Sequence, residues 1–299
     1  MTTAVAIIHQ RDYRFLLRTK AAAFEELLPH MRRWRVGSGL IPDIKSAAAP
    51  VPLRIEMLGQ LRVLVDGEPV PPEAWKRRRA LEIFAYLVEC AGAGVSRARL
   101  IDLYWPESDA DAAHDSLRVT ITAIRKAVGD VIKYESNAYR FIAPPGTSVD
   151  VQDFKAHIDA ARQADGSGNV AEARKHYQSA VDLYGGDFLE GMQEGGWQWR
   201  ERELLRAGCL EALRWLADLA LRSGDVRAQR FAVERLLEVA PFELEAVKAR
   251  LDALCRESRV VEAKRDYEEW RSRYRAAVGA DAPDVWQAVE IGAASVVSQ

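Results

Sequence analysis

Alternating apolar and polar residues predict a β-hairpin in the stretch LRIEMLGQLRVLVDGEPV (53–70). A period of two residues is typical of strands that bury one face, and the alternation breaks at Gly59-Gln60 before it resumes. The second run ends at Asp66-Gly67, a dipeptide that favours tight turns. We therefore expect this region to begin a folded domain with a pair of short strands.

Apolar residues three and four positions apart then predict three helices. They occupy residues 75–89, residues 97–105 and the stretch HDSLRVTITAIRKAVGD (114–130) with the residues just before it. Ser96 is placed to cap the second helix, and Pro106 is expected to stop it, because proline cannot donate a helical hydrogen bond.

A second β-hairpin is predicted in VIKYESNAYRFIA (131–143), where two short β-prone runs meet around Glu135-Ser136-Asn137. The predicted order is thus hairpin, three helices, hairpin. A winged helix-turn-helix arranges these elements compactly, with its third helix offered to solvent and a hairpin beside it.

The chain from residue 150 onward is nearly all helical in pattern. The offset from Gly224 to Ser258 equals the roughly 34-residue period of tetratricopeptide repeats, and Pro241 falls where such repeats end a helix. Three helix starts resemble one another: SGNVAEARKHYQSAVDLY (167–184), SGDVRAQRFAVERLLEVAP (223–241) and ESRVVEAKRDYEEW (257–270). This region therefore predicts stacked helix pairs.

The interior of these helix pairs can be predicted from their apolar faces. We expect one group of leucines to form the continuous core: Leu183, Leu213, Leu216, Leu236, Leu237 and Leu254. Trp197, Trp199 and Trp215 are expected to join this core rather than to form a ligand cage.

The boundaries between these regions follow from composition. SAAAPVP (46–52) is small, uncharged and contains proline, which is typical of a linker. We predict an N-terminal helical segment and linker over 1–52, a winged-helix domain over 53–145 and a helical-repeat domain over 146–299. The expected fold class is mainly α with small β elements.

Composition bounds the class of protein and its surroundings. With 299 residues, 48% of them hydrophobic and 29% charged, the chain is expected to be a soluble globular protein of several domains. Its apolar runs are too short to span a membrane or to serve as a signal peptide, so the sequence predicts a cytoplasmic protein without a membrane partner. The net charge of −2 combines a basic 1–52, a balanced 53–145 and an acidic 146–299. Any DNA-binding surface must therefore be local.

Motifs for catalysis, metal binding or cofactor binding are not recognisable. The sequence contains no phosphate-binding loop, nucleophile elbow or HExxH motif, and its 5 histidines do not show metal-ligand spacing. Cys90, Cys209 and Cys255 lie far apart in helical patterns and are expected to be reduced core thiols. We therefore expect no metal, no cofactor and no enzymatic activity.

The third predicted helix carries the first candidate binding site. Opposite its apolar face lie Arg118, Thr122, Arg125 and Lys126, with few acidic residues among them. Arginine can pair with guanine edges in a major groove, and threonine can contact bases or phosphates. A solvated helix face is the competing interpretation, but the neighbouring hairpin favours DNA, with Arg140 expected near its tip to reach a minor groove.

Cations also precede the first helix, at Lys76, Arg77, Arg78 and Arg79. Positive charge at a helix start opposes the helix dipole, which indicates that a bound phosphate offsets it. We therefore include Lys76, Arg77 and Arg78 among the predicted DNA contacts. Alternatively, these side chains are only solvated cations at the start of the helix and bind no ligand.

An acidic loop, WPESDAD (105–111), separates the second and third helices. Ser108 and Asp111 match the capping box Ser-x-x-acid, so capping of the third helix explains part of it. A second class of function also stays open. The chain could be a helical-repeat scaffold whose winged domain binds protein rather than DNA.

Several stretches together resemble a known family. LRIEMLGQLRV, WKRRRALEIFAYLV, VSRARLIDLYWPESDADAAHDSLRVTITAIRKAVGD, AYRF, YGGDFLEG and WRERELLR are similar to an OmpR-type winged helix joined to a bacterial transcriptional activator domain, as in SARP-type regulators. The resemblance covers about 53–290. It implies a transcription activator whose third helix and wing bind tandem DNA repeats, and whose loop before that helix contacts RNA polymerase.

The resemblance also assigns residues to these roles. On the DNA side it points to Ser116, Arg118, Thr120, Thr122, Arg125 and Lys126 on the helix and to Arg140 on the wing. For the polymerase it points to Glu107, Ser108, Asp109 and Asp111. The family usually has glycine before the wing tyrosine, whereas Ala138 precedes Tyr139 here, so we expect a different wing turn with Asn137 in any left-handed conformation that it requires.

Residues 7–49 resemble the end of the helical sensor region that precedes this output module in MalT-like regulatory ATPases. The resemblance implies the C-terminal part of a longer regulator, with a stand-alone protein as the alternative. The partners expected are double-stranded DNA, RNA polymerase and either a second copy of the chain or an upstream sensor domain. Whether the repeat domain senses a ligand, binds a sensor or dimerises stays open.

Overall fold

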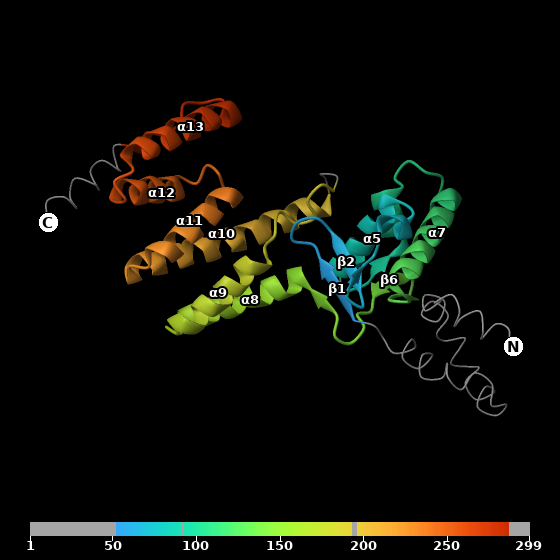
Figure 1. The fold of residues 1–299 in the computed structure, drawn as a ribbon. Helices are drawn as coiled ribbons and strands as arrows, with labels where there is room; N and C mark the ends of the chain where they lie inside the picture. Colours follow the sequence, from blue (N-terminus) through green and yellow to red (C-terminus); the bar gives the residue numbers. More distant parts are fainter. Residues whose placement is uncertain (1–51, 91–92, 193–195, 287–299) are drawn as a thin grey trace, which may run out of the picture. The chain divides into compact units, whose positions relative to one another are not determined.

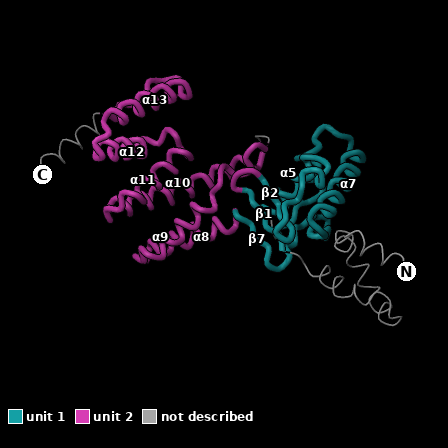
Figure 2. The backbone as a smooth tube through the Cα atoms, in the orientation of Figure 1, with its two compact units in different colours: residues 1–57, 61–150 teal, residues 58–60, 151–299 magenta. Residues whose placement is uncertain are grey.

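The computed structural model describes residues 52–90, 93–192 and 196–286 (Figure 1). Two compact units divide the chain: unit 1 contains residues up to 57 and residues 61–150, and unit 2 contains residues 58–60 and those from 151 onward (Figure 2). The predictions made for 1–51, including the resemblance to a sensor region, lie outside the described residues. The domain boundaries at 52 and 145 remain predictions, because compactness alone does not show where an independently folding domain ends.

Unit 1 begins with a small sheet. Strand β1 (Leu53–Glu56) pairs antiparallel with β2 (Arg62–Val65), and β2 pairs with the short β3 (Glu68–Pro69). This confirms the first predicted hairpin. Strand β7 (Ser148–Val149), distant in sequence, adds in parallel to the other edge of β1, so the strand order is β3-β2-β1-β7.

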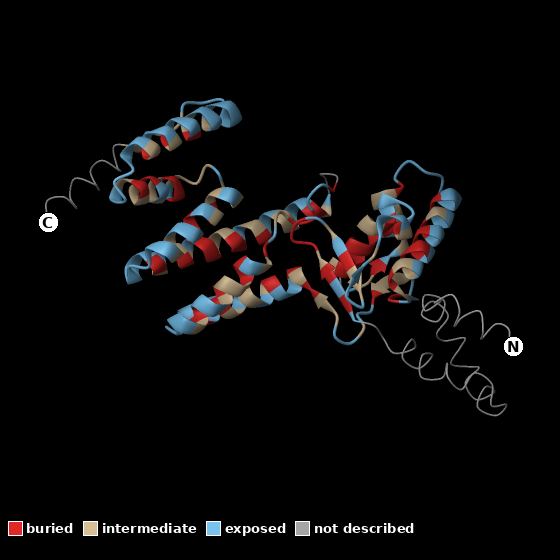
Figure 3. Cartoon of the chain, in the orientation of Figure 1, coloured by how far each residue is buried: buried red, intermediate tan, exposed pale blue. Residues whose placement is uncertain are grey.

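Three helices follow the sheet, as the apolar spacing predicts. They are α5 (Arg78–Glu89), α6 (Arg97–Tyr104) and α7 (Ala110–Val128), with a short 3-10 turn η2 (Pro72–Trp75) ahead of them. Their apolar faces meet in one core that includes Phe84, Leu100, Leu117 and Ile124, all fully buried. The core therefore holds α7 by one face and leaves its other face exposed (Figure 3).

A second sheet forms the wing. Strand β5 (Ile132–Glu135) pairs antiparallel with β6 (Ala138–Phe141), and β6 pairs with the two-residue β4 (Val95–Ser96). The turn between β5 and β6 places Ser136 and Asn137 at φ values of 49° and 62°. The left-handed conformation expected of Asn137 is confirmed. Ser136 adopts it too, because a two-residue hairpin turn of this twist needs positive φ at both positions.

One of the two capping predictions is correct. The Ser96 side chain accepts a hydrogen bond from the Arg99 amide at 3.1 Å, which confirms it as the cap of α6. The Ser108–Asp111 capping box is wrong, since α7 begins one residue later with Asp109 at the N-cap position, and Asp109 forms no side-chain cap hydrogen bond.

Unit 2 is helical, as predicted. Its helices are α8 (Asp150–Gly166), α9 (Val170–Leu183), α10 (Trp197–Ser223), α11 (Val226–Val239), α12 (Leu244–Arg256) and α13 (Val260–Val278). The repeated starts share a local structure. Asn169 caps α9 through the Glu172 amide at 3.2 Å, and Asp225 caps α11 through the Ala228 amide at 3.0 Å.

The predicted interior of unit 2 is largely correct. Leu213, Leu216, Leu236 and Leu254 are buried, whereas Leu183 and Leu237 are only half-buried. Cys209 is buried, but Cys90 and Cys255 are half-buried rather than core thiols. The placement of the tryptophans is wrong for Trp199, which is 64% exposed on α10, while Trp197 and Trp215 are half-buried.

Candidate nucleic-acid interface

The exposed face of α7 carries cations at helical spacing. Asp115, Arg118, Thr122 and Lys126 follow one another three or four residues apart, and all four are exposed. Among the described residues, the side chains of Arg118 and Lys126 have no hydrogen-bond or ion-pair partner. Two cations on one helix face thus remain available to an external ligand.

The structure removes Thr120 from this face. Thr120 is only 7% exposed, and its hydroxyl donates a hydrogen bond to the Ser116 carbonyl at 2.7 Å. Ser116 itself is half-buried at the edge of the face. The Thr122 hydroxyl donates in the same way to the Arg118 carbonyl at 2.9 Å, but it stays exposed. Thr122 therefore fits the expected surface, whereas Thr120 belongs to the core side.

Arg125 lies at the boundary between the two faces and already has partners. Its Nε and Nη2 atoms donate to the Ile132 carbonyl of β5 at 3.0 Å and 2.7 Å, and its Nε lies 3.4 Å from an Asp130 carboxylate oxygen. A guanidinium with these donors committed fastens α7 to the wing. Arg125 is therefore less suited to contact DNA bases than the sequence suggests.

Arg140 does not lie at the wing tip. It pairs with Lys133 in the β5–β6 register, two positions back from the turn-flanking pair of Glu135 and Ala138. Its side chain lies against Gly94, where a Cβ atom would approach the Arg140 Cγ to 3.0 Å. The expected tip position is therefore wrong, because the cross-strand register places this arginine toward the base of the hairpin.

The start of α5 carries a cluster of cations. Lys76, Arg77, Arg78 and Arg79 are all exposed. Arg77 occupies the N-cap without a side-chain cap hydrogen bond, and the first turn contains no acidic residue. Arg78 pairs with Glu82 at 3.2 Å, and the Arg79 guanidinium lies 5.0 Å from the centre of the Trp105 ring. Cations grouped in this way can contact a phosphate.

Sequence analysis missed an arginine–tyrosine cluster under the wing. Arg97 of α6 stacks 5.1 Å from the centre of the Tyr134 ring and donates to its hydroxyl, which in turn donates to Asn137 at 2.7 Å. Burial raises the pKa of the neighbouring Tyr139 phenol, while the positive charges of Arg97 and Arg118 act in the opposite direction. No sequence pattern links these residues, because strand pairing brings them together.

The acidic loop before α7 exposes all of its carboxylates, while Trp105 at its start is buried. Glu107, Ser108, Asp109 and Asp111 are all exposed, and the three carboxylates have no ion-pair partner among the described residues. Since Asp109 does not cap α7 through its side chain, capping does not account for the loop's acidity.

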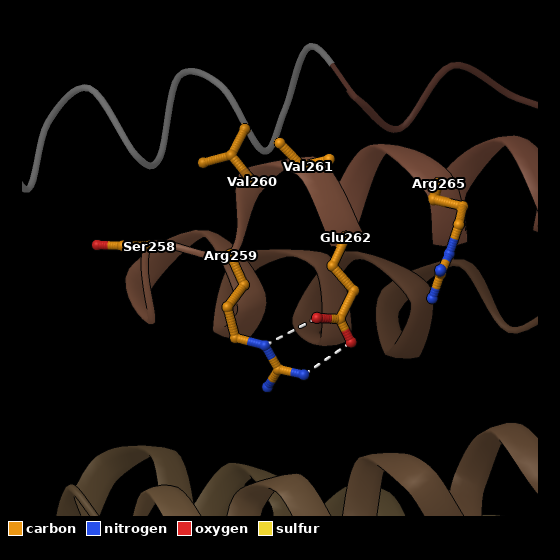
Figure 4. Close-up of a pocket in the computed structure, with 6 residues that line it drawn as sticks. All are labelled: Ser258, Arg259, Val260, Val261, Glu262 and Arg265. Carbon is orange, nitrogen blue, oxygen red and sulfur yellow. Dashed lines mark hydrogen bonds and ion pairs between the residues drawn. The ribbon is translucent and has the colours of Figure 1, made fainter.

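The described part of unit 2 contains surface hollows. A hollow of about 380 Å³ lies at the start of α13. Figure 4 shows residues that line it, among them Arg259, which holds Glu262 in a two-point ion pair at 2.9 Å and 2.7 Å. Arg259 also pairs with Glu257 at 2.8 Å, so its charge is already balanced.

The described helices include none long and apolar enough to cross a membrane.

Comparison with known proteins identifies the repeat region. The model of the bacterial transcriptional activator domain matches residues 149–290. The chain is 26% identical over 230 residues to the regulatory protein AfsR of Streptomyces coelicolor, covering 77% of this chain and 23% of AfsR. It is 28% identical over 184 residues to the regulatory protein DnrI of Streptomyces peucetius, covering 56% of this chain and 66% of DnrI.

A third relative has a solved structure. The transcriptional regulatory protein EmbR of Mycobacterium tuberculosis is 27% identical over 156 residues, which are 50% of this chain and 39% of EmbR. Its structure in complex with a low affinity phosphopeptide superposes with a TM-score of 0.61 at 20% identity, covering 82% of this chain and 65% of that one. Each match spans less than two thirds of the relative's own length. With its winged helix and helical-repeat region, the chain resembles the SARP-type transcriptional regulators that carry a bacterial transcriptional activator domain.

Proposed function

We propose that unit 1 binds double-stranded DNA with α7 in the major groove. The observation that carries this proposal is the exposed row of Arg118, Thr122 and Lys126, two of whose members are cations without a partner in the described chain. An arginine can bond guanine O6 and N7 together, and a lysine beside it can contact a base or a phosphate. The opposite face of α7 is committed to the core, so the helix can present only this side.

Phosphate contacts beside the groove complete the proposed interface. The start of α5 offers the exposed cations Lys76 and Arg77, which can contact phosphates. The pair of Arg97 and Tyr134 shapes the wing next to α7. Phosphate contacts of this kind position a protein on the duplex, while contacts from α7 read the bases.

We further propose that the bound chain activates transcription in the cytoplasm by recruiting RNA polymerase through residues 107–111. Support comes from the exposed, unpaired carboxylates of Glu107, Asp109 and Asp111, which can pair with basic residues of a partner. Unit 2 would then serve regulation, by binding an effector, an upstream sensor domain or a second copy of the chain.

A binding assay tests the DNA proposal directly. The parent, Arg118→Ala and Lys126→Ala would be titrated with duplexes selected by the parent from a random library, at two salt concentrations. Loss of a base contact should weaken specific binding by roughly 1–3 kcal/mol. Loss of a phosphate contact should weaken binding to all sequences and reduce the salt slope by roughly one.

The control for this assay is Arg62→Ala, which removes an exposed arginine from β2. It should bind DNA as the parent does. If the parent binds neither selected nor unrelated duplexes, even at low salt, the winged domain is not a DNA reader and the protein-scaffold interpretation gains support.

A further inference from the structure

An apolar side chain stands among the polar residues on the exposed face of α7. Val119 is 62% exposed and lies one helical turn from Asp115 on one side and Thr122 on the other. The next residue, Thr120, is buried. Valine and threonine have nearly the same shape, and either could occupy either position. Here the apolar residue faces solvent and the polar residue faces the core, which is the reverse of the usual pattern.

Valine at position 119 adds little to the stability of the helix by itself. A β-branched residue at an exposed helix position loses side-chain freedom, and it recovers this loss only where it packs against a neighbour. Burial of Thr120 does not require a valine at position 119 either, because the Thr120 hydroxyl already donates a hydrogen bond to the Ser116 carbonyl. An external partner with an apolar group at this point would supply that packing.

We propose that Val119 contacts the 5-methyl group of a thymine and so selects thymine at one position of the bound DNA. This inference rests on the proposed placement of α7 in the major groove. Among the base edges displayed there, the thymine methyl is the apolar group, and every other feature is a hydrogen-bond donor or acceptor. Arg118 and Thr122 beside Val119 would occupy the neighbouring polar positions.

The test removes the methyl group alone. Duplexes selected from a random library by the full chain would be resynthesised with one thymine at a time replaced by deoxyuridine, which retains the hydrogen-bonding edge. Affinities would be measured for the parent and for Val119→Ala. One replacement should weaken binding of the parent roughly fourfold, the factor that corresponds to about 0.8 kcal/mol for one buried methyl group. The same replacement should leave the affinity of Val119→Ala unchanged.

The comparison between the two proteins separates the contact from DNA shape. A change in groove geometry caused by uracil would affect the parent and Val119→Ala equally. Val226→Ala, which alters a valine that is 59% exposed in unit 2, should keep the parent's response to uracil. Val119→Ala should also keep the parent's melting temperature, because the side chain packs against little of the fold.

The outcomes distinguish this inference from the proposal on which it rests. If selected duplexes bind tightly but no uracil replacement distinguishes the parent from Val119→Ala, the thymine contact is wrong and DNA binding stands. If selection enriches no sequence, both ideas fall together. A thymine whose methyl matters to the parent alone supports both.

Discussion

The Arg125 guanidinium of α7 donates two hydrogen bonds to one backbone carbonyl, that of Ile132 in β5. Seven residues separate them in sequence, and the chain reverses direction between them at Gly129, whose φ of 89° lies in the left-handed region. The contact ties the end of the candidate recognition helix to the first strand of the wing. Arg125 thus positions the end of α7 against the wing, and on the exposed face of α7 Arg118 and Lys126 remain without a partner among the described residues.

We predict that Arg125→Ala lowers the free energy of unfolding by about 1–2 kcal/mol. Hydrogen bonds from a charged group contribute roughly 1.5–3 kcal/mol, and the partial exposure of Arg125 reduces this value. Lys126→Ala, at the exposed neighbouring position, should change stability by less than about 0.5 kcal/mol. Urea unfolding of both variants measures the difference. If Arg125→Ala is as stable as the parent but discriminates less between DNA sequences, Arg125 contacts bases rather than holding α7 to the wing.

Replacing Glu107, Asp109 and Asp111 by alanine should reduce transcription in a reconstituted assay while DNA affinity stays close to that of the parent. The reason is that these carboxylates are exposed, and Asp109 does not cap α7 through its side chain. Stability should change by no more than about 1 kcal/mol, the scale of a carboxylate at a helix start. Gel shift and transcription would be measured on the same duplex. Equal losses in both would mean that the loop supports α7 rather than a polymerase contact.

Leu236→Ala in α11 should destabilise unit 2 by roughly 2–5 kcal/mol, because the side chain is 3% exposed and its truncation leaves a cavity. The matched variant is Leu237→Ala, one residue further along the same helix. Leu237 is half-buried, so its replacement should cost clearly less. Thermal unfolding compares the two directly, and equal shifts in melting temperature would contradict the helix register.

Glu211 should make the stability of unit 2 depend on pH in the acid range. Arg162 of α8 donates to both of its carboxylate oxygens, at 2.9 Å and 2.6 Å, and this interaction lowers the pKa of Glu211 below its ordinary value of 4.5. A lowered folded-state pKa means that the stabilisation is complete above the unfolded-state pKa. It is lost as the pH falls through the folded-state value.

Glu211→Gln tests this dependence. The variant removes the charge, so it should be less stable than the parent by up to about 1 kcal/mol near neutral pH, and the difference should vanish in strong acid. Urea unfolding at about pH 6 and about pH 3 measures both values. A constant difference between the two proteins would show that the ion pair with Arg162 does not carry the effect.

Local periodicity determined the elements and their order. A period of two residues in 53–70 and in 131–143 yields the two hairpins, and apolar spacing of three and four yields α5, α6 and α7. The same spacing and the repeated starts yield the helix pairs of unit 2. These predictions succeed because the spacing of apolar residues decides whether a segment buries one face as a strand or as a helix. That spacing can be read from a few consecutive residues.

Tertiary structure decided which polar side chains face outward. The sequence places Thr120, Arg125 and Arg140 among the predicted DNA contacts, yet Thr120 is buried, Arg125 bonds the Ile132 carbonyl and Arg140 lies against Gly94. Likewise, Arg97 meets Tyr134 only because the β5–β6 hairpin pairs with β4, the strand directly before Arg97. Helical periodicity gives the direction in which a residue points around the helix axis. For a residue at the boundary between the buried and exposed faces, the acceptors that distant strands place nearby decide whether its side chain turns toward the core or toward solvent. Those acceptors are backbone carbonyls and aromatic rings whose positions depend on strand register, which no short stretch of this sequence specifies.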